Sequence, residues 1–317
     1  MQYGSQRKWV ICVGDLNFDV VASFESSLAS SRDTFLTSLH LSLGGGAANV
    51  AVGLARLGLT SVLITRIGRD LFGRYLIQKL KTETVQTAHV QIDPSQQTGF
   101  VVSLISANGE RILHSFRGAN IDLKHKKIKY RDLPASSICH ISGYSFLQDS
   151  QRATSLKLID FAQQKDWSVS VDLGPEMNRI SRADLSTILD RTDLLLISQN
   201  EALQISRTPS WSEAIDYLLE AGPDIVALKS GAKGCYVGRD QFRHHVQPFK
   251  VKAIDTTGAG DAFNSGFIFG ITEGWSLERS ALAGNAVAAM KITRAGAIDG
   301  LPTREQLMTF LQKNKAI

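Results

Sequence analysis

The chain has 317 residues, of which 43% are hydrophobic and 21% are charged. This composition is typical of a folded domain with a sizeable core and excludes a disordered or fibrous chain. The formal net charge of +5 bears on solubility and non-specific binding, and does not by itself indicate a nucleic-acid partner.

Three further features bear on where the protein works. The cysteines Cys12, Cys139 and Cys235 are widely spaced without a CxxC pair, which predicts a reducing cytoplasm and no disulfide or zinc framework. The basic run at residues 124–131 carries no nucleic-acid motif, and we expect a solvated surface there. No apolar stretch reaches the roughly 18 residues of a spanning helix. We therefore expect no membrane or nucleic-acid partner.

Strand and helix patterns alternate from the start of the chain. The apolar run at residues 9–13 ends at a Gly-Asp pair, which favours a buried first strand over a signal peptide. Three glycines at 44–46 then open a helical pattern that stops at Gly58. The next strand and helix are predicted at residues 61–67 and 71–81.

An Asn-Gly pair at residues 108–109 interrupts this alternation. It separates two apolar-rich runs, residues 98–106 and 111–116, and predicts a hairpin in a small β appendage. The alternation then resumes, which indicates a mostly parallel sheet with helices on both faces and a ligand site beyond its carboxyl edge. The later strands are predicted at residues 138–141, 169–172, 194–198, 225–229 and 234–237.

The strongest site signal is DTTGAGDAF at residues 255–263. Gly258, Ala259 and Gly260 lead into a helix, and small residues there let an anion approach the unpaired N–H groups of its first turn. Asp261 lies in the same turn. Alone it would be interpreted as a helix cap, but a cap does not require glycines before it, so we favour a role in phosphoryl transfer. The segment fits neither the GxGxxG pattern nor the P-loop.

Three other segments carry polar groups that suit a ligand. Asn49 follows the glycines at 44–46 and can donate to and accept from hydroxyls, although a flexible turn would look the same. Asn17 and Asp19 point the same way in an extended chain, which suits adjacent sugar hydroxyls or merely a polar loop. The loop of residues 229–234 (KSGAKG) is either a simple turn or a contact to a nucleotide phosphate.

Taken together, these segments resemble the ribokinase-like carbohydrate kinase family, also called the pfkB family. The resemblance spans essentially the whole chain and rests on the signatures GGGAANVAVGLARLG and DTTGAGDAFNSGF. It implies one domain over residues 1–317 with a three-layer αβα fold and a mostly parallel central sheet. It also implies a small β lid from segments near residues 17–22, 37–43, 98–106 and 111–118.

The resemblance assigns a role to each matching position. Asp261 matches the family's catalytic base, beside an anion hole made by Gly258, Ala259 and Gly260. The positions that match sugar contacts are Asn17, Asp19, Gly45, Gly46 and Asn49. The positions that match the ATP site are Ser198, Lys229, Gly231, Gly234 and Asn285.

The sequence departs from the family pattern in the phosphate and sugar sites. The family commonly has Asn-x-x-Glu after the fifth strand, and these residues contact phosphate and magnesium-bound water. Glu201 is present here, but Ser198 stands at the Asn position. Ribokinase has a lysine where Gly46 stands and a sugar-binding glutamate near Gly143 or Tyr144 that this chain lacks. We therefore do not expect ribose as the substrate.

A monovalent-cation site is common in the family and would be formed here by Asp255, the carbonyl of Thr257 and the loop of residues 294–300. Ribokinase has a serine where Gly300 stands, so one oxygen ligand is missing. Activation by K⁺ is therefore left open by the sequence.

We expect an ATP- and Mg²⁺-dependent phosphotransferase that acts on a hydroxymethyl group of a small sugar or sugar derivative. A nucleoside or pseudo-nucleoside kinase of the same fold is the alternative, and a non-catalytic ligand-binding regulator is the remote one. The lid side chains expected to shape the pocket are Phe18, Phe100, His114, Phe116 and Arg117. Arg117 would either meet the carboxylate of a sugar acid or be a solvated lid residue. Because a β appendage exposes strand edges, we also expect a homodimer through the lid.

Overall fold

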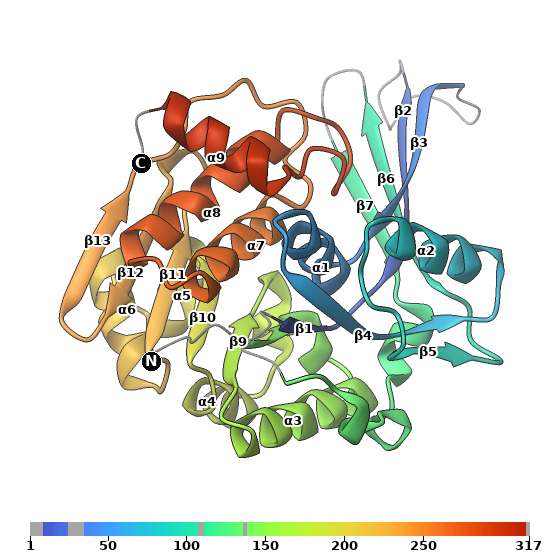
Figure 1. The fold of residues 1–317 in the computed structure, drawn as a ribbon, viewed down its shortest axis with the longest axis horizontal. Coiled ribbons are helices and arrows are strands. Elements are labelled where there is room, and N and C mark those ends of the chain that lie inside the picture. The colour runs from blue at the N-terminus through green and yellow to red at the C-terminus, as the bar shows by residue number, and fades with distance from the viewer. Residues whose placement is uncertain (1–8, 25–34, 107–110, 136–137, 315–317) are drawn as a thin grey trace.

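The computed structural model describes residues 9–24, 35–106, 111–135 and 138–314. They form a central sheet between two layers of helices, with a smaller sheet projecting to one side (Figure 1). The strands of the central sheet are β1 (Trp9–Val13), β4 (Thr60–Gly68), β5 (Val90–Asp93), β8 (Ile138–Ser142), β9 (Ser168–Asp172), β10 (Leu194–Ser198), β11 (Ile225–Lys229), β12 (Cys235–Arg239) and β13 (Phe242–Val246).

The central sheet is mostly parallel, which confirms the predicted fold class. Its strand order is β13-β12-β11-β10-β9-β8-β1-β4-β5. Only the edge hairpin departs from the parallel arrangement, because β12 runs antiparallel to both β11 and β13. The carboxyl ends of β1, β9, β10 and β11 therefore meet at one edge of the sheet, where parallel sheets place their ligands.

Alternate residues of β1 enter the two cores that flank the sheet. Val10 and Cys12 belong to one hydrophobic cluster, and Ile11 and Val13 belong to the other. The first cluster is covered by α1 (Gly46–Arg56), α2 (Leu71–Thr82), α7 (Ala259–Thr272), α8 (Leu277–Lys291) and α9 (Arg304–Lys313). The second is covered by α3 (Asp149–Gln164), α4 (Arg182–Asp190), α5 (Gln199–Ser206) and α6 (Trp211–Glu220).

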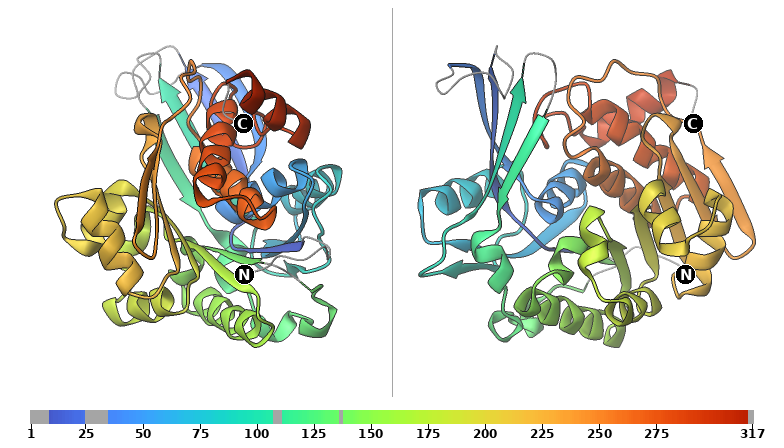
Figure 2. Two further views of the ribbon diagram at one scale, coloured as in Figure 1. Left: turned by 60° about the vertical axis from the view of Figure 1, so that its left-hand side comes forward. Right: turned by 180° about the vertical axis from the view of Figure 1, so that it is seen from behind.

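The smaller sheet leans away from the body beside α1 and α2 (Figure 2). Its strands are β2 (Asn17–Phe24), β3 (Leu36–Gly44), β6 (Gly99–Ser106) and β7 (Arg111–Phe116), in the order β3-β2-β6-β7. The two strands of the predicted hairpin, β6 and β7, pair antiparallel, while its Asn108-Gly109 turn lies outside the described residues. The rings of Phe18 and Phe100 stack 5.6 Å apart, and Phe18 lies 4.6 Å from Phe72 of α2. These two rings therefore attach the sheet to the body.

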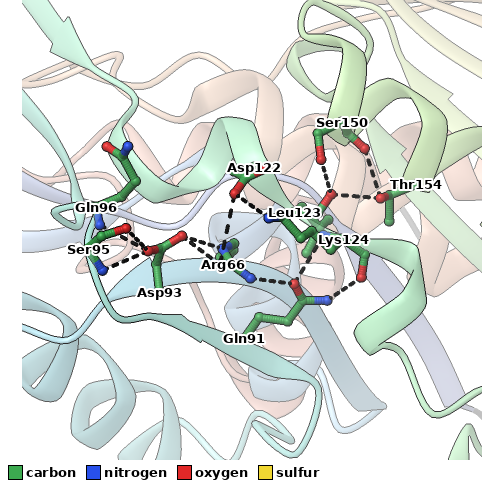
Figure 3. A network of polar contacts seen from close by, with 10 residues as sticks. All are labelled: Arg66, Gln91, Asp93, Ser95, Gln96, Asp122, Leu123, Lys124, Ser150 and Thr154. Atoms are coloured by element: carbon green, nitrogen blue, oxygen red, sulfur yellow. Dashed lines mark hydrogen bonds and ion pairs between the residues drawn. The ribbon is translucent and has the colours of Figure 1, made fainter.

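A buried polar network secures the far edge of the central sheet (Figure 3). Arg66 of β4 and Asp93 of β5 are each 2% exposed, and the guanidinium donates to the carboxylate over 2.8 and 2.6 Å. Arg66 also donates to Gln91, whose amide in turn donates to the carbonyl of Lys124. Strand β5 buries its polar residues Gln91 and Asp93 and exposes Ile92, which is the reverse of the pattern that predicts a strand. The sequence alone therefore does not predict β5.

Two other features bear on the expectations from the sequence. The basic run at residues 124–131 forms short 3₁₀ turns with mostly exposed lysines, as expected for a solvated surface. Cys12, Cys139 and Cys235 are free and buried. Among the residues that the structure describes, no helix is long and apolar enough to cross a membrane.

Candidate active site

Asp261 lies in the first turn of α7, which begins after Gly258. Gly258 is the N-cap residue and has a φ of 70°, a left-handed conformation that glycine adopts without strain. No side chain caps this helix. The helix-cap interpretation of Asp261 is therefore wrong. Within the first turn, the N–H of Ala259 donates to the carbonyl of Thr256 over 3.1 Å, which leaves the N–H groups of Gly260 and Asp261 for a ligand.

The carboxylate of Asp261 is held by Asn49 of α1, whose Nδ2 donates to Oδ2 over 2.8 Å. Burial raises the pKa of Asp261 to about 6, and the negative charge of Asp172 adds to the rise, while the Asn49 hydrogen bond opposes it. A carboxylate with this pKa is ionised at neutral pH but close enough to it to exchange a proton, which is what a general base requires.

The glycine run at 44–46 lies between two carboxylates. A Cβ on Gly44 would lie 2.0 Å from Oδ2 of Asp19, and one on Gly46 would lie 3.5 Å from Oδ1 of Asp261. Gly45 has a φ of 97°, and a Cβ there would lie 2.3 Å from the carbonyl oxygen of Asp15. Gly44 and Gly45 therefore need to be glycine, because a Cβ would collide with Asp19 at the first and with the Asp15 backbone at the second, whereas at Gly46 a Cβ would make ordinary contact with Asp261.

Asn17 is oriented by a residue that sequence reasoning missed. Asn120, which is fully buried, donates from Nδ2 to Oδ1 of Asn17 over 2.9 Å and bonds both the N–H and the carbonyl of Leu16. Only the Gly-Ala-Asn run after the lid hairpin could have hinted at it.

Arg117 already has a carboxylate partner within the chain. Its Nε and Nη2 donate to the two oxygens of Asp15 over 2.9 and 2.8 Å, and Nη2 also bonds Gln151 and the carbonyl of Tyr144. The side chain is only 19% exposed, so it is not a solvated lid residue. Its charge is therefore paired within the chain, while its Nη1 is buried without a hydrogen-bond partner in the part of the chain that the structure describes.

Two adjoining cavities meet at the start of α7. One, of about 420 Å³, is lined by polar residues that include Asp261, Ser142 and Glu201. The other, of about 530 Å³, has a largely apolar lining that includes Phe249 and Phe263. The residues common to both are Lys229, Gly231, Thr256, Ala259 and Gly260. We call the first the acidic cavity and the second the apolar cavity. They meet at the N-terminus of α7, where the helix dipole favours an anion.

Lys229 reaches this junction from the end of β11. Its Nζ donates to Oδ2 of Asp172 over 2.8 Å and to Oδ1 of Asn264 over 3.3 Å. Asn264 also donates to the same oxygen of Asp172. Sequence reasoning missed Asp172 and Asn264 as site residues, although Asp172 ends a parallel strand, which is where ligand-binding side chains gather.

Ser198 and Glu201 form a capping box at the start of α5. The Ser198 hydroxyl accepts from the N–H of Glu201, and Glu201 accepts from the N–H of Ser198 over 2.9 Å. Both residues line the acidic cavity. The serine at the position where the family commonly has asparagine thus has a local role as a helix cap.

The other residues predicted at the ATP site lie around the apolar cavity. Gly231, Gly234 and Asn285 all line it. Asn285 donates to the carbonyls of Val246 and Gln247 over 3.1 and 3.0 Å, which fixes the end of β13. Its amide hydrogens are therefore already used within the chain.

The loop before α7 is braced by Asp255. Its Oδ1 accepts from the N–H and hydroxyl of Thr257, and its Oδ2 accepts from the N–H of Gly296. Burial alone would raise the pKa of Asp255, but these hydrogen bonds and the charge of Lys291 hold it below its usual range. The side chain of Lys291 is fully buried, and its Nζ donates to the carbonyl of Asp255 over 2.8 Å. Sequence reasoning missed this lysine.

Comparison with known proteins gives a consistent result. The family model described as pfkB family carbohydrate kinase matches residues 7–304. A ribokinase of Haemophilus influenzae is 28% identical over 96% of this chain and 99% of its own. An uncharacterized sugar kinase of Archaeoglobus fulgidus is 31% identical over 79% of this chain and 98% of its own.

Solved structures of similar proteins share the fold along their whole length. The ribokinase of Thermotoga maritima superposes with a TM-score of 0.84 at 27% identity, covering 97% of this chain and 100% of that one. The nucleoside kinase of Methanocaldococcus jannaschii does so with a TM-score of 0.83 at 25% identity, covering 98% and 100%.

Proposed function

This chain belongs to the pfkB family of carbohydrate kinases, and from that premise we propose that it phosphorylates a hydroxymethyl group of a small sugar or sugar derivative, with ATP as donor. In general terms, the reaction is phosphoryl transfer to an alcohol group, the reaction class of the family and of the relatives named ribokinase and fructokinase. The observation that supports the proposal most is the position of Asp261, a carboxylate with a raised pKa at the uncapped N-terminus of α7.

The chemistry follows from the groups that surround this position. Asp261 accepts the proton of the acceptor hydroxyl as its oxygen attacks the γ-phosphorus in line. The N–H groups at Gly260 and Asp261 and the dipole of α7 stabilise the negative charge on the transferring group. Lys229, which is paired with Asp172, lies at the junction of the two cavities and would hydrogen-bond the phosphates from there.

The apolar cavity suits the adenine and ribose of ATP, since Phe249, Phe263, Ala288 and Ile292 form a wall for a flat base. Asp172 and Glu201 both line the acidic cavity, and one or two carboxylates near phosphates are the donor set that Mg²⁺ takes. Held near these carboxylates, Mg²⁺ would supply positive charge that offsets the negative charge of the phosphates.

A sugar acceptor is favoured by the polar groups near Asp261. Asn17, Asp19 and Asn49 offer hydrogen-bonding groups close to the glycine run at 44–46, and such groups suit vicinal hydroxyls. The charge of Arg117 is already paired with Asp15, although its buried Nη1 has no hydrogen-bond partner among the described residues. We therefore propose a neutral sugar or polyol as the acceptor.

The likeness to the nucleoside kinase of M. jannaschii keeps a nucleoside acceptor as the second candidate. ADP release measured with equal panels of neutral sugars, sugar acids and nucleosides separates these possibilities. We expect turnover with a neutral sugar. Turnover only with nucleosides contradicts the substrate class, and tight sugar binding with no ADP release from any acceptor indicates a non-catalytic regulator.

We also propose that the protein is a homodimer through the small sheet. Apolar side chains on its two edge strands are exposed, among them Leu36, Leu39 and Leu41 of β3 and Leu113 and Phe116 of β7, and an exposed apolar group of this kind marks an interaction surface. A second copy of the same sheet would cover both edge strands.

A further inference from the structure

We propose that the ammonium group of Lys291 takes the place of the monovalent cation at the loop before α7, so that this enzyme carries its own cation and is not activated by K⁺. The inference concerns residues 255–257 and 291–300 and does not depend on which acceptor is phosphorylated.

The first observation is the position of the ammonium group. Lys291 is 0% exposed, and its Nζ lies 2.8 Å from the carbonyl oxygen of Asp255. Backbone carbonyls are also what K⁺ takes in place of its hydration shell. Asp255 belongs to the loop that runs directly into Gly258 and Asp261, so a positive charge bound here fixes the path of the chain into the anion hole.

The second observation is that the carboxylate expected to bind the cation is engaged by the protein itself. Both oxygens of Asp255 accept hydrogen bonds, at 2.9 and 2.6 Å from the N–H and hydroxyl of Thr257 and at 2.9 Å from the N–H of Gly296. The negative charge that would attract K⁺ is therefore met by three protein donors and by the nearby ammonium group.

The third observation concerns Gly300, where ribokinase has a serine. A Cβ on Gly300 would lie 2.3 Å from the carbonyl oxygen of Lys291 and 2.9 Å from its Cα. No side-chain oxygen can stand at this position while Lys291 keeps its backbone path. The backbone path of Lys291 thus excludes an oxygen-bearing side chain at position 300, and the same residue supplies an ammonium group. We infer that the residues present do not fit a bound K⁺.

A buried ammonium group is costly unless it is hydrogen-bonded and paired, so Lys291 has either this cation role or a purely structural one. The charge of Lys291 also lowers the pKa of Asp261 against the effect of burial, which places it within electrostatic reach of the base. Truncation of Lys291 destabilises the fold in both cases. Only the cation role predicts that an added cation repairs the damage.

The first test measures thermal unfolding and requires no acceptor. Wild type, Lys291→Ala and the exposed control Lys313→Ala are unfolded in KCl, NaCl and tetramethylammonium chloride at equal ionic strength. We expect wild type and control to unfold at the same temperature in all three salts. Lys291→Ala should unfold roughly 5–10 °C lower in tetramethylammonium chloride and recover a large part of that loss in KCl only. A specific stabilisation of wild type by K⁺ overturns the proposal.

The second test follows ADP release in the same salts, with Lys291→Met added. Wild type should be equally active with and without K⁺. Lys291→Ala should be impaired and regain activity with K⁺, since the truncated side chain leaves room for the ion. Lys291→Met should be impaired without rescue, because its apolar chain fills that room. A Lys291→Ala variant that is as active as wild type without K⁺, or that K⁺ does not rescue in either test, overturns the proposal.

If Lys291→Ala fails to fold in tetramethylammonium chloride, refolding yield in KCl against NaCl replaces the melting temperature as its readout, and a yield independent of K⁺ counts against the proposal. Failure of this inference is distinct from failure of the proposed function. The thermal-unfolding test requires no turnover. Even if the protein had no kinase activity, the effect of K⁺ on the unfolding temperature of Lys291→Ala would still decide this inference.

Discussion

Nδ2 of Asn49 donates a hydrogen bond of 2.8 Å to Oδ2 of Asp261, a residue 212 positions further along the chain. The bond joins the first turns of α1 and α7, each of which begins after a glycine with positive φ. The two signatures that the sequence shows separately are thus one site in the fold.

The first prediction concerns the pH dependence of catalysis. Because the pKa of Asp261 is about 6 and only the ionised carboxylate accepts a proton, kcat/KM should fall as the pH decreases through about 6. Asn49→Ala removes a hydrogen bond to the ionised form, which raises the pKa of Asp261 further. The acid limb of the pH profile should therefore move to higher pH.

The control for this prediction is Asn178→Ala, which changes an exposed asparagine that lines neither of the two cavities. Its profile should match that of wild type. An Asn49→Ala profile with an unshifted acid limb would show that this hydrogen bond does not tune the group that titrates in catalysis.

The second prediction concerns Lys229. Its ammonium group lies where the two cavities meet, so Lys229→Met removes a positive charge beside the phosphates while keeping the length of the side chain. The KM for ATP should rise roughly 10–100-fold, the worth of one charge-assisted hydrogen bond. Lys157→Met, which changes an exposed lysine that lines neither cavity, is the control. Equal steady-state constants for the two variants would remove Lys229 from the phosphate site.

The third prediction concerns stability. Asp93→Ala removes the hydrogen-bonded carboxylate of the buried Arg66 and leaves the partly exposed Asp122, 3.9 Å away, as the carboxylate near the guanidinium. The free energy of unfolding should fall by about 3–5 kcal/mol in urea titrations. Asp149→Ala breaks a comparable pair with Arg152, but Asp149 is 94% exposed, so its cost should be about 0–1 kcal/mol. Similar costs for the two variants would contradict a structural role for the network in Figure 3.

The same carboxylate has a pH signature. Burial alone would raise the pKa of Asp93, but hydrogen bonds from Gln96, Ser95 and Arg66 hold it well below its usual range. A depressed pKa contributes stability above the unfolded value of 3.8, and that contribution is lost as the pH falls below it. The acid loss of stability should therefore be smaller in Asp93→Ala than in wild type.

The fourth prediction concerns assembly. Leu39 and Leu113 are 57% and 54% exposed on the two edge strands of the small sheet. If a second copy covers them, the double variant Leu39→Glu, Leu113→Glu should sediment as a monomer at concentrations where wild type is a dimer, because burying unpaired carboxylates is costly. A monomeric wild type at tens of micromolar contradicts the proposal.

Much of the fold could be predicted because the strands of the central sheet are continuous apolar runs, and β1, β10 and β11 lie where the sequence predicts them. The edge strands β5 and β13 could not, since β5 buries polar residues in a network and β13 has three consecutive polar residues, an arginine and two histidines, between its apolar ends. Their pairing depends on tertiary contacts that no local pattern encodes.

The site divides in a similar way. Motifs bring out Asp261 and Asn49 because each follows a run of glycine and other small residues that marks its segment in the sequence. Asp172 and Lys291 lack such a mark: one is an ordinary acidic residue at a strand end, and the other is a lysine at the end of a helix, where lysine is common for electrostatic reasons alone. Only the fold places them beside Lys229 and Asp255.

The central claim is that Asp261 is the catalytic base, and Asp261→Asn tests it most directly. Gly258 caps α7 and Asp261 makes no cap hydrogen bond, so the variant should unfold at the same urea concentration and bind ATP as wild type does. Its phosphoryl-transfer rate in a single turnover, with ATP and acceptor saturating, should fall by roughly 10²–10⁴, the usual contribution of a general base. A folded Asp261→Asn variant that transfers phosphate at the wild-type rate would contradict the account.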